Sequence, residues 1–166
     1  MDSGNIGFVL LCAAFVFVMT PGLAMFYGGL VRKKNVVNTM MTSIFIIGVG
    51  IVMWVLFGYS LSFAPSGNAF IGDFRWLGLE GVSLTEGYTD GASIPNMVFS
   101  AFQMMFAVIT PALITGAVAG RMKFKSIFVF TIFWSLIVYY PLAHMVWGQG
   151  GLLGADGIGA LDFAGG

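Results

Sequence analysis

Long apolar stretches separated by short polar segments dominate the chain. The stretches cover residues 6–30, 36–64, 97–119 and 126–147, and none of them contains Asp, Glu, Lys or Arg. About 20 residues of apolar helix cross the hydrocarbon core of a bilayer, so each stretch is long enough to span it. The pattern predicts an all-α integral membrane protein with four transmembrane helices.

Composition agrees with a bilayer as the solvent. Of the 166 residues, 58% are hydrophobic and 8% are charged, whereas soluble domains carry about 25% charged residues. Residues 1–5 contain Asp2 and no base, unlike the positive start of a secretory signal, so the first stretch is interpreted as a retained helix. The formal net charge is zero, which removes the electrostatic basis for nucleic-acid binding.

The charged residues predict an orientation. Six of the seven bases fill the two short turns between the first and second and between the third and fourth stretches: Arg32, Lys33, Lys34, Arg121, Lys123 and Lys125. Cytoplasmic loops of membrane proteins carry an excess of Lys and Arg. We therefore expect both basic turns to be cytoplasmic, and the N-terminus, the long segment 65–96 and the glycine-rich segment 148–162 to face outside.

Prolines and small residues give local expectations. Pro21 and Pro111 interrupt the first and third stretches, and each should kink its helix. Gly116 and Gly120 form a small-xxx-small pattern that permits close helix approach. The segment 65–95 is compatible with either a short surface helix or a strand.

The membrane-depth residues argue against an enzyme. They include no carboxylate pair and no cluster of metal ligands, and one His with one Cys cannot build a zinc site, so we expect no catalytic residue, metal site or cofactor. His144, among apolar residues of the fourth stretch, is more often a packed histidine with a backbone partner than a catalytic base.

Aromatic residues are the more informative candidates. Phe99, Phe102 and Phe106 share one face of the third predicted helix. Such a stripe commonly packs on lipid or on another helix. The functional hypothesis places Phe106 and Trp147 at the outer mouth of an apolar path, where their rings would attract a small cation by roughly 0.5–2 kcal/mol.

Several motifs together resemble the ammonium transporter (Amt/Mep/Rh) family. They are TPGLAMFYGGLVR at residues 20–32, AFQ at 101–103 with Phe106, AHMVWG at 143–148 and DFAGG at 162–166. They follow in order along essentially the whole chain. The resemblance implies ammonium or ammonia transport, with no enzymatic activity.

The resemblance also implies roles for individual residues. Trp147 and Phe106 match the aromatics of the outer cation site and gate, and Phe102 matches a neighbour on the same face. Asp162 matches an aspartate that supports this site, and its position ahead of small residues is typical of the N-cap of a fifth helix. Residues matching the apolar pore wall are Leu23, Tyr27, Ile109 and Leu113.

Members of the family resemble two inverted five-helix halves, assembled as trimers, with a pair of pore histidines. Neither histidine is expected within this chain, and His144 matches neither. Residues 1–166 are therefore interpreted as the N-terminal part of a single transporter domain that does not conduct alone. The expected partners are ammonium or ammonia, the lipid bilayer, two further copies and possible cytoplasmic regulators.

Two alternatives from other classes stay open at this point. One is a nonconducting membrane assembly or regulatory module. The other is a small four-span exporter, which would usually need an ionisable residue at membrane depth to couple protons. The four stretches contain no Asp, Glu, Lys or Arg.

Overall fold

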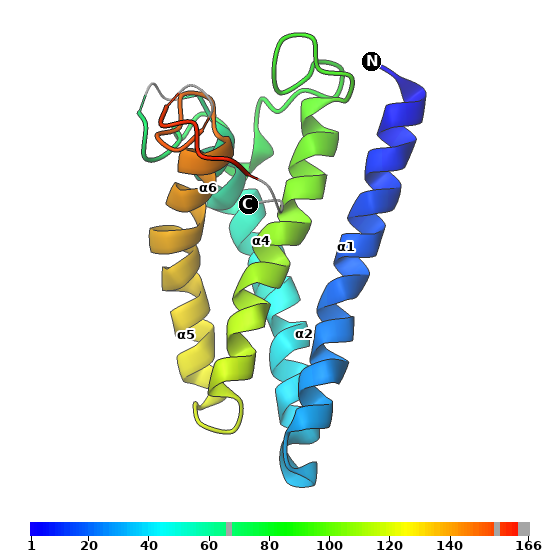
Figure 1. Ribbon diagram of the computed structural model, residues 1–166, viewed down its shortest axis with the longest axis vertical. Helices are drawn as coiled ribbons and strands as arrows, with labels where there is room; N and C mark the ends of the chain where they lie inside the picture. The colour runs from blue at the N-terminus through cyan, green and yellow to red at the C-terminus, as the bar shows by residue number, and fades with distance from the viewer. Residues whose placement is uncertain (66–67, 155–156, 163–166) are drawn as a thin grey trace. The chain divides into compact units, whose positions relative to one another are not determined.

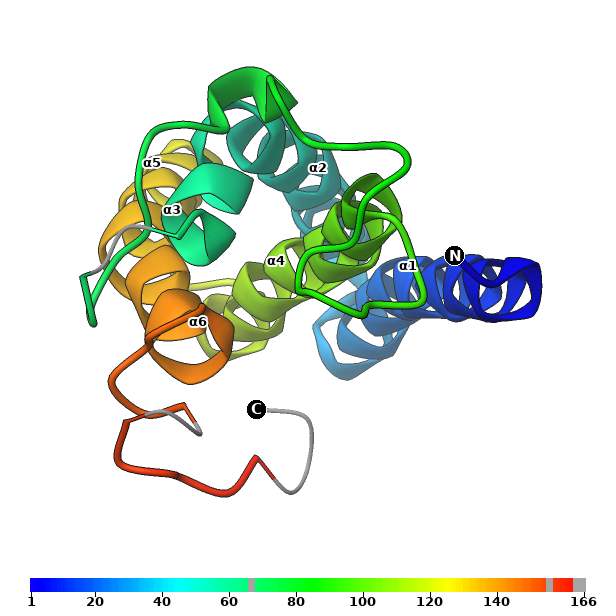
Figure 2. The same cartoon turned by 90° about the horizontal axis from the view of Figure 1, so that it is seen from above.

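A computed structural model describes residues 1–65, 68–154 and 157–162. Helices connected by turns and loops make up the described residues, with no strand among them. The chain divides into two compact units. Unit 1 consists of Met1–Val52 with Val82–Ile132, and unit 2 consists of Met53–Gly81 with the described residues from Phe133 onward. Figure 1 labels helices α1, α2, α4, α5 and α6, and Figure 2 also labels α3.

The four predicted spans are confirmed. Among the described residues, four helical stretches are long and apolar enough to cross a membrane: Ser3–Leu30, Lys33–Phe63, Asn96–Val118 and Phe124–Trp147. Their ends differ from the sequence prediction by at most three residues. Pro21 and Pro111 lie inside helices that continue through them.

In unit 1, helix α1 (Ser3–Leu30) runs alongside helix α4 (Asn96–Val118) (Figure 1). The Asp2 side chain caps α1 by accepting a hydrogen bond from the Asn5 N–H at 2.9 Å. Near the other end of α1, a Cβ atom at Gly116 would lie 2.5 Å from Tyr27 Cζ. The predicted close approach at Gly116 is thereby confirmed, because any side chain there would displace the Tyr27 ring.

Helices α2 (Val36–Met53) and α5 (Phe124–Trp134) contribute to the same unit. Its buried apolar cluster takes Ile46 from α2, Ala112 from α4 and Ile127 from α5. A Cβ atom at Gly50 would lie 3.0 Å from Val108 Cγ2, so α2 and α4 also approach closely at a glycine. Small residues thus set the helix spacing in unit 1, as is common in membrane bundles.

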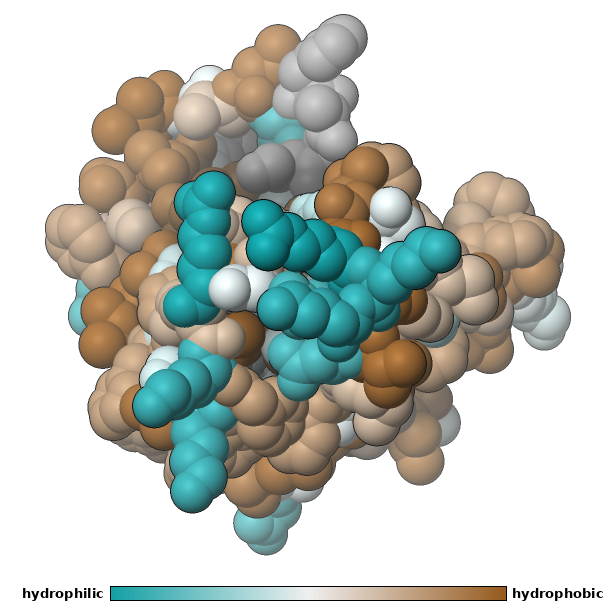
Figure 3. Space-filling view, turned by 90° about the horizontal axis from the view of Figure 1, so that it is seen from below, coloured by the Kyte–Doolittle hydropathy of each residue, from teal (hydrophilic) through white to brown (hydrophobic). Residues whose placement is uncertain are grey.

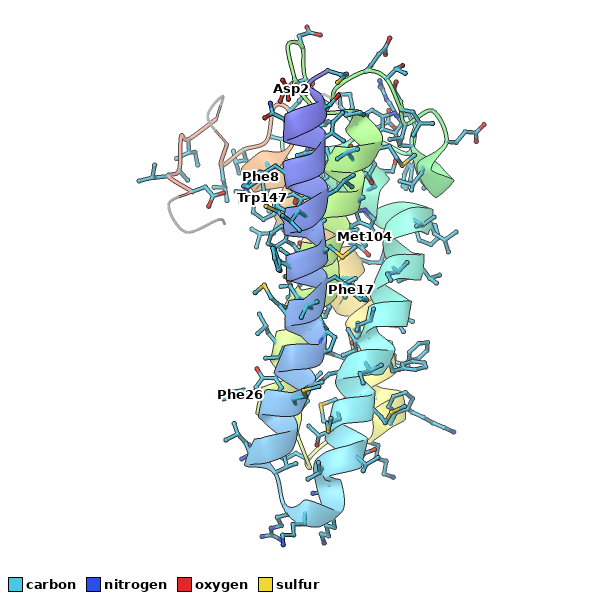
Figure 4. The ribbon with its side chains drawn as sticks, turned by 90° about the vertical axis from the view of Figure 1, so that its right-hand side faces the viewer. Asp2, Phe8, Phe17, Phe26, Met104 and Trp147 are labelled. Carbon is cyan, nitrogen blue, oxygen red and sulfur yellow. The ribbon has the colours of Figure 1, made fainter. Side chains whose placement is uncertain are left out.

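The outward surface of α1 is apolar. In the most apolar 18-residue part of α1, only 11% is buried inside the protein. The corresponding share is 33% in each of the other three spans. Phe8 and Phe26 on one side of α1 and Phe17 on the other are 67%, 61% and 40% exposed (Figure 4). Such a surface is suited to contact with lipid chains or with another apolar protein surface.

Unit 2 is built around aromatic side chains. A π-helical turn (Trp54–Gly58) continues into α3 (Tyr59–Phe63), and a second π-helical turn (Ser135–Tyr139) continues into α6 (Tyr140–Trp147). The Trp54 and Tyr140 rings pack edge to face, with their centroids 6.1 Å apart. A Cβ atom at Gly58 would lie 2.7 Å from Tyr140 Cζ, so glycine is required where the two segments meet.

The described part of the segment that follows α3 is ordered by backbone contacts. Ser60 Oγ donates to the Asp73 carbonyl at 2.6 Å and accepts from the Trp76 N–H at 3.0 Å. The Phe74 N–H, which donates to the Asp73 carboxylate, and the Arg75 side chain beside it lower the pKa of Asp73. The sequence left open a helix or a strand here, and the structure has a single 3-10 turn, Leu77–Leu79.

The part of this segment that belongs to unit 1, residues 82–95, lies over the start of α4 (Figure 2). The Asn96 N–H donates to the Glu86 carbonyl at 2.7 Å, and Asp2 N–H donates to the Ser93 carbonyl at 2.9 Å. Tyr88 stacks on Phe99 with ring centroids 4.8 Å apart. These contacts join the N-terminus, the loop and the start of α4 at one end of unit 1.

The six bases of the two turns gather at the opposite end of unit 1. In Figure 3 the hydrophilic side chains cluster at this end of the molecule. A Cβ atom at Gly120 would lie 3.2 Å from Asn35 Nδ2, which places the two turns side by side. The acids of unit 1 are Asp2, Glu86 and Asp90, and they lie on the segments of the other end.

This separation of charge leads to a labelling prediction. In a Cys12→Ser background, single cysteines at Lys33 and Lys123 should react with an impermeant maleimide added from one side of the membrane, and a cysteine at Asp90 from the other side. The reason is that the span Lys33–Phe63 lies between Lys33 and Asp90 in the chain, and the span Asn96–Val118 lies between Asp90 and Lys123. Labelling of Lys33→Cys and Asp90→Cys from the same side would contradict the four-span fold.

Candidate functional site

An aromatic and aliphatic stripe runs along α4. Its members are Phe102, Phe106, Ile109 and Leu113, whose spacing of four, three and four residues places them on one helix face. Phe102 and Phe106 contact each other edge to face, with ring centroids 5.1 Å apart. Both are partly exposed, whereas Ile109 is 8% exposed and Leu113 is 48% exposed.

Helix α1 supplies the two remaining residues that the sequence assigned to the pore wall. Tyr27 donates its hydroxyl hydrogen bond to the Leu113 carbonyl at 2.9 Å. Leu23, one turn earlier, packs against the cluster of Ile46, Ala112 and Ile127. The structure therefore brings these residues together with the α4 stripe inside unit 1.

Trp147 and Asp162 form the second group, in unit 2. The Trp147 indole N–H donates to a carboxylate oxygen of Asp162, with Nε1 and Oδ2 2.7 Å apart. The sequence proposed both residues for the same site, but it did not predict the bond between them.

The glycine-rich segment after α6 returns the chain to Trp147. Gly148 N–H donates to the His144 carbonyl at 2.9 Å, and Leu153 N–H donates to the Met145 carbonyl at 2.8 Å. A Cβ atom at Gly148 would lie 2.5 Å from His144 Nδ1, which leaves no room for a side chain. The chain can pass this close to the His144 ring because residue 148 is glycine. Ala160 N–H donates to the Leu153 carbonyl at 3.0 Å, two residues before Asp162.

This arrangement has a chemical consequence for the Trp147 ring. The hydrogen bond fixes the orientation of the indole, and the carboxylate places a negative charge beside it. The face of an indole attracts cations through its quadrupole, and a nearby anion adds to that attraction. By this chemistry, the class of ligand that the pair would attract is a cation.

His144 has a structural place in unit 2, as its sequence context predicted. It is fully buried, with Nδ1 3.0 Å from the Ser62 carbonyl oxygen and Nε2 2.8 Å from the Asn68 carbonyl oxygen. Both ring nitrogens are thus occupied by backbone carbonyls. The ring connects α6 to α3 and to residue 68.

The proposed site residues thus occur as two groups, one in each unit. The predicted role of Asp162 as N-cap of a fifth helix concerns residues 163–166, which lie outside the described residues. Within the described ranges, no group of three or more His, Cys, Asp or Glu side chains is placed to hold a metal ion. One feature of the sequence could have predicted the Trp147–Asp162 bond. The two residues are separated by a glycine-rich segment, which allows the chain to turn back on itself.

The apolar spans define the class first: this is a multi-pass membrane protein. The family follows from the comparison with known proteins. The Ammonium Transporter Family model matches residues 7–166. The chain belongs to this family, whose members are transporters and not enzymes.

Individual relatives agree. The chain is 51% identical over 167 residues to an ammonium transporter of Bacillus subtilis, covering all of this chain and 40% of that protein. It is 43% identical over 171 residues to an ammonium transporter of Aquifex aeolicus, covering all of this chain and 38% of that protein. It therefore spans about two fifths of the length of these relatives.

Solved structures of the same kind also match. The crystal structure of Saccharomyces cerevisiae Mep2 is 35% identical and superposes with a TM-score of 0.81, over 92% of this chain and 34% of the other. Candida albicans Mep2 is 30% identical with a TM-score of 0.81, over 92% of this chain and 33% of the other. The predicted fold class and family resemblance are confirmed.

The Trp147–Asp162 bond can be tested in the purified protein labelled with ¹⁵N-tryptophan. Asp162→Ala removes the acceptor, so the indole N–H proton of Trp147 should shift upfield and exchange faster with solvent. Asp162→Asn keeps a carbonyl acceptor and should give a smaller change. Trp147→Phe assigns the signal, and the indole signals of Trp54 and Trp134 serve as internal controls. An unchanged Trp147 signal in Asp162→Ala would show that no such bond forms.

Proposed function

We propose that this chain is the N-terminal part of a single transmembrane domain that transports ammonium or ammonia through an apolar pore. The observation that carries the proposal is the family match over residues 7–166. The four charge-free stretches and the two groups of site residues are compatible with it. By this proposal the chain supplies the outer mouth and part of the pore wall, and it does not conduct alone.

The proposed mouth is assigned to Trp147, Phe106 and Phe102, the three aromatic residues that match the outer site of the family. The support for Trp147 is its bond to Asp162, which orients the ring and puts negative charge beside it. The support for Phe106 is its place on the partly exposed α4 stripe, in edge contact with Phe102. Asp162 acts here as a positioning residue, through Trp147.

The path beyond the mouth is assigned to the α4 stripe. Ile109 and Leu113 continue the face that carries Phe106, and Leu23 and Tyr27 border it from α1. Tyr27 keeps α1 attached to α4 at the Leu113 carbonyl, so its hydroxyl is used in packing. An apolar wall of this kind favours passage of a small neutral molecule over an ion, because an ion would lose its hydration without compensation.

We further propose that the two basic turns face the cytoplasm, on the positive-inside rule. The maleimide experiment also tests this, because it shows which side labels Lys33→Cys. A homotrimer is proposed for the complete protein, with the exposed apolar surface of α1 available to lipid or to another copy. With this orientation, the basic end of unit 1 is the part of the chain that a cytoplasmic regulator would contact.

Trp147→Leu in the complete protein keeps apolar bulk and removes the cation-binding ring. Loss of roughly 0.5–2 kcal/mol of cation attraction should weaken the apparent affinity for methylammonium by about 2- to 30-fold. Uptake of radiolabelled methylammonium in a strain without other ammonium transporters measures it. Trp134→Leu is the control, because Trp134 lies outside the proposed site. Equal kinetics for wild type and Trp147→Leu would remove Trp147 from the site.

Phe106→Ala should change the transport rate with a modest loss of stability. Phe106 is partly exposed, so its removal should cost less than the roughly 3–5 kcal/mol of a sealed aromatic cavity. Phe99→Ala is the comparison on the same helix, because Phe99 stacks on Tyr88 and has no proposed site role. Melting temperatures in detergent and uptake per folded molecule decide between gate and core. A Phe106→Ala protein that melts far below Phe99→Ala and transports normally would make Phe106 a core residue.

A further inference from the structure

The segments that follow α3 and α6 meet at residues 68 and 69 in unit 2. The Leu152 N–H, in the glycine-rich segment after α6, donates to the Ala69 carbonyl at 2.9 Å. Nε2 of His144 in α6 lies 2.8 Å from the Asn68 carbonyl oxygen, across 76 residues of sequence. Two successive carbonyls therefore contact both α6 and the segment that leads from α6 to Asp162.

The Asn68 side chain holds the turn that presents these two carbonyls. Its Oδ1 accepts a hydrogen bond from the Phe70 N–H at 2.9 Å, as in an Asx turn. The turn is attached to α3, because the Gly72 N–H donates to the Leu61 carbonyl at 2.7 Å. Asn68 is exposed, so its replacement by a smaller residue leaves no sealed cavity. The effect of such a replacement is therefore confined to the turn and to what the turn contacts.

From Leu152 the hydrogen bonds continue to the residues just before Asp162. The Leu152 carbonyl accepts from the Ile158 N–H at 2.8 Å, and the Leu153 carbonyl accepts from the Ala160 N–H at 3.0 Å. Residues 152 and 153 are thus bonded on both sides, to residue 69 and α6 on one side and to residues 158 and 160 on the other. Asp162 follows two residues later, so its place depends on this set of bonds.

One glycine between Leu152 and Asp162 has a backbone conformation that other residues rarely adopt. Gly159 has a φ of +71°, in the left-handed region. A Cβ atom at Gly159 would have no other atom within 4 Å, so the requirement for glycine is conformational and not steric. Alanine would strain the backbone at this point, whereas asparagine adopts the left-handed region more readily. Gly159 therefore gives a second means of disturbing the path of the chain to Asp162.

We propose that Asn68 is a positioning residue of the cation site, acting on Trp147 through Leu152 and the segment that ends at Asp162. The inference rests on the proposed function, in which Trp147 attracts the cation. The turn at Asn68 fixes the Ala69 carbonyl, which fixes Leu152, and the bonds beyond Leu152 bring the Asp162 carboxylate to the indole N–H. A hydrogen bond weakens steeply as its angle departs from linearity. Loosening the turn therefore weakens the Trp147–Asp162 bond and frees the indole ring to leave its cation-attracting orientation.

The first test follows the Trp147 indole signal in the complete protein, purified in detergent and labelled with ¹⁵N-tryptophan. Asn68→Ala removes the acceptor of the turn, so this signal should shift upfield, in the same direction as in Asp162→Ala and by a smaller amount. Asn68→Asp keeps a side-chain oxygen at the turn and should restore the wild-type signal. Ser83→Ala is the matched control, because Ser83 Oγ accepts from the Glu86 N–H at 2.9 Å in a loop of unit 1. An unchanged Trp147 signal in Asn68→Ala would overturn the proposal.

A pair of glycine variants tests the second half of the connection independently of Asn68. Gly159→Ala should shift the Trp147 indole signal, and Gly159→Asn should shift it less. Gly91→Ala is the matched control, because Gly91 has a φ of +77° in unit 1 and a Cβ atom there would also have no other atom within 4 Å. If Gly159→Ala left the signal unchanged, or Gly91→Ala shifted it equally, the path through Leu152 would be wrong.

Uptake of radiolabelled methylammonium separates this inference from the proposed function. Asn68→Ala should weaken the apparent affinity, by less than Trp147→Leu does, and should leave the maximal rate per folded molecule unchanged. Asn68→Asp should restore the affinity. Weaker affinity in Trp147→Leu with wild-type affinity in Asn68→Ala would overturn the positioning role alone, as would a fall in maximal rate without a change in affinity. Wild-type kinetics in both variants, with a shifted indole signal in Asn68→Ala, would instead overturn the assignment of the mouth to Trp147.

Discussion

Hydrocarbon offers no hydrogen-bond partners, so the polar groups of the spans must find theirs within the protein. The described polar side chains follow this constraint closely. Thr42, Thr110 and Thr115 donate to carbonyls of their own helices, and Tyr27 donates to the Leu113 carbonyl across two helices. Ser43 and Thr115 hydroxyls lie 3.3 Å apart between α2 and α4. The buried hydroxyls of Thr20 and Ser62 are the exceptions among the described residues. Close packing at glycines and hydrogen bonds from hydroxyls therefore hold the helices of unit 1 together alongside the buried apolar cluster of Ile46, Ala112 and Ile127.

His144 is subject to the same constraint, and it has two ring nitrogens that need partners within the protein. Its two ring nitrogens face two carbonyl oxygens, those of Ser62 and Asn68. A neutral imidazole has one N–H and can donate to only one of them, whereas an imidazolium donates to both. In either form the ring is occupied by backbone, and Gly148 packs directly on its Nδ1 side. His144 therefore holds the end of α6 in place three residues before Trp147, and a substitution there would act on the mouth through the backbone.

The sequence predicted those features that depend on local pattern or on the bilayer. Span lengths, the grouping of bases in two turns, the shared face of Phe102 and Phe106, and the close approach at Gly116 all follow from periodicity, charge or side-chain size.

Contacts that join distant parts of the chain were not predicted. Tyr27 and Leu113 are 86 residues apart in the sequence. The Trp147–Asp162 bond depends on the backbone hydrogen bonds that turn the segment after α6 back toward Trp147. The Tyr88–Phe99 stack likewise depends on a loop whose sequence was compatible with a helix or a strand.

The proposed mouth and the proposed path make opposite demands on charge. Asp162 beside Trp147 favours a cation at the ring face, because the carboxylate and the indole quadrupole attract it together. Along the α4 stripe, by contrast, Ile109 and Leu113 offer a cation neither an acceptor nor a counter-charge. An ammonium ion recruited at the ring would therefore cross this wall at a large desolvation cost, while ammonia would cross at a small one. Recruitment as a cation and passage as a neutral molecule are compatible only if a base accepts the proton between them. The proposal therefore assigns to this chain attraction at the mouth and selectivity along the path, and it assigns no proton transfer to His144, whose two ring nitrogens face backbone carbonyl oxygens.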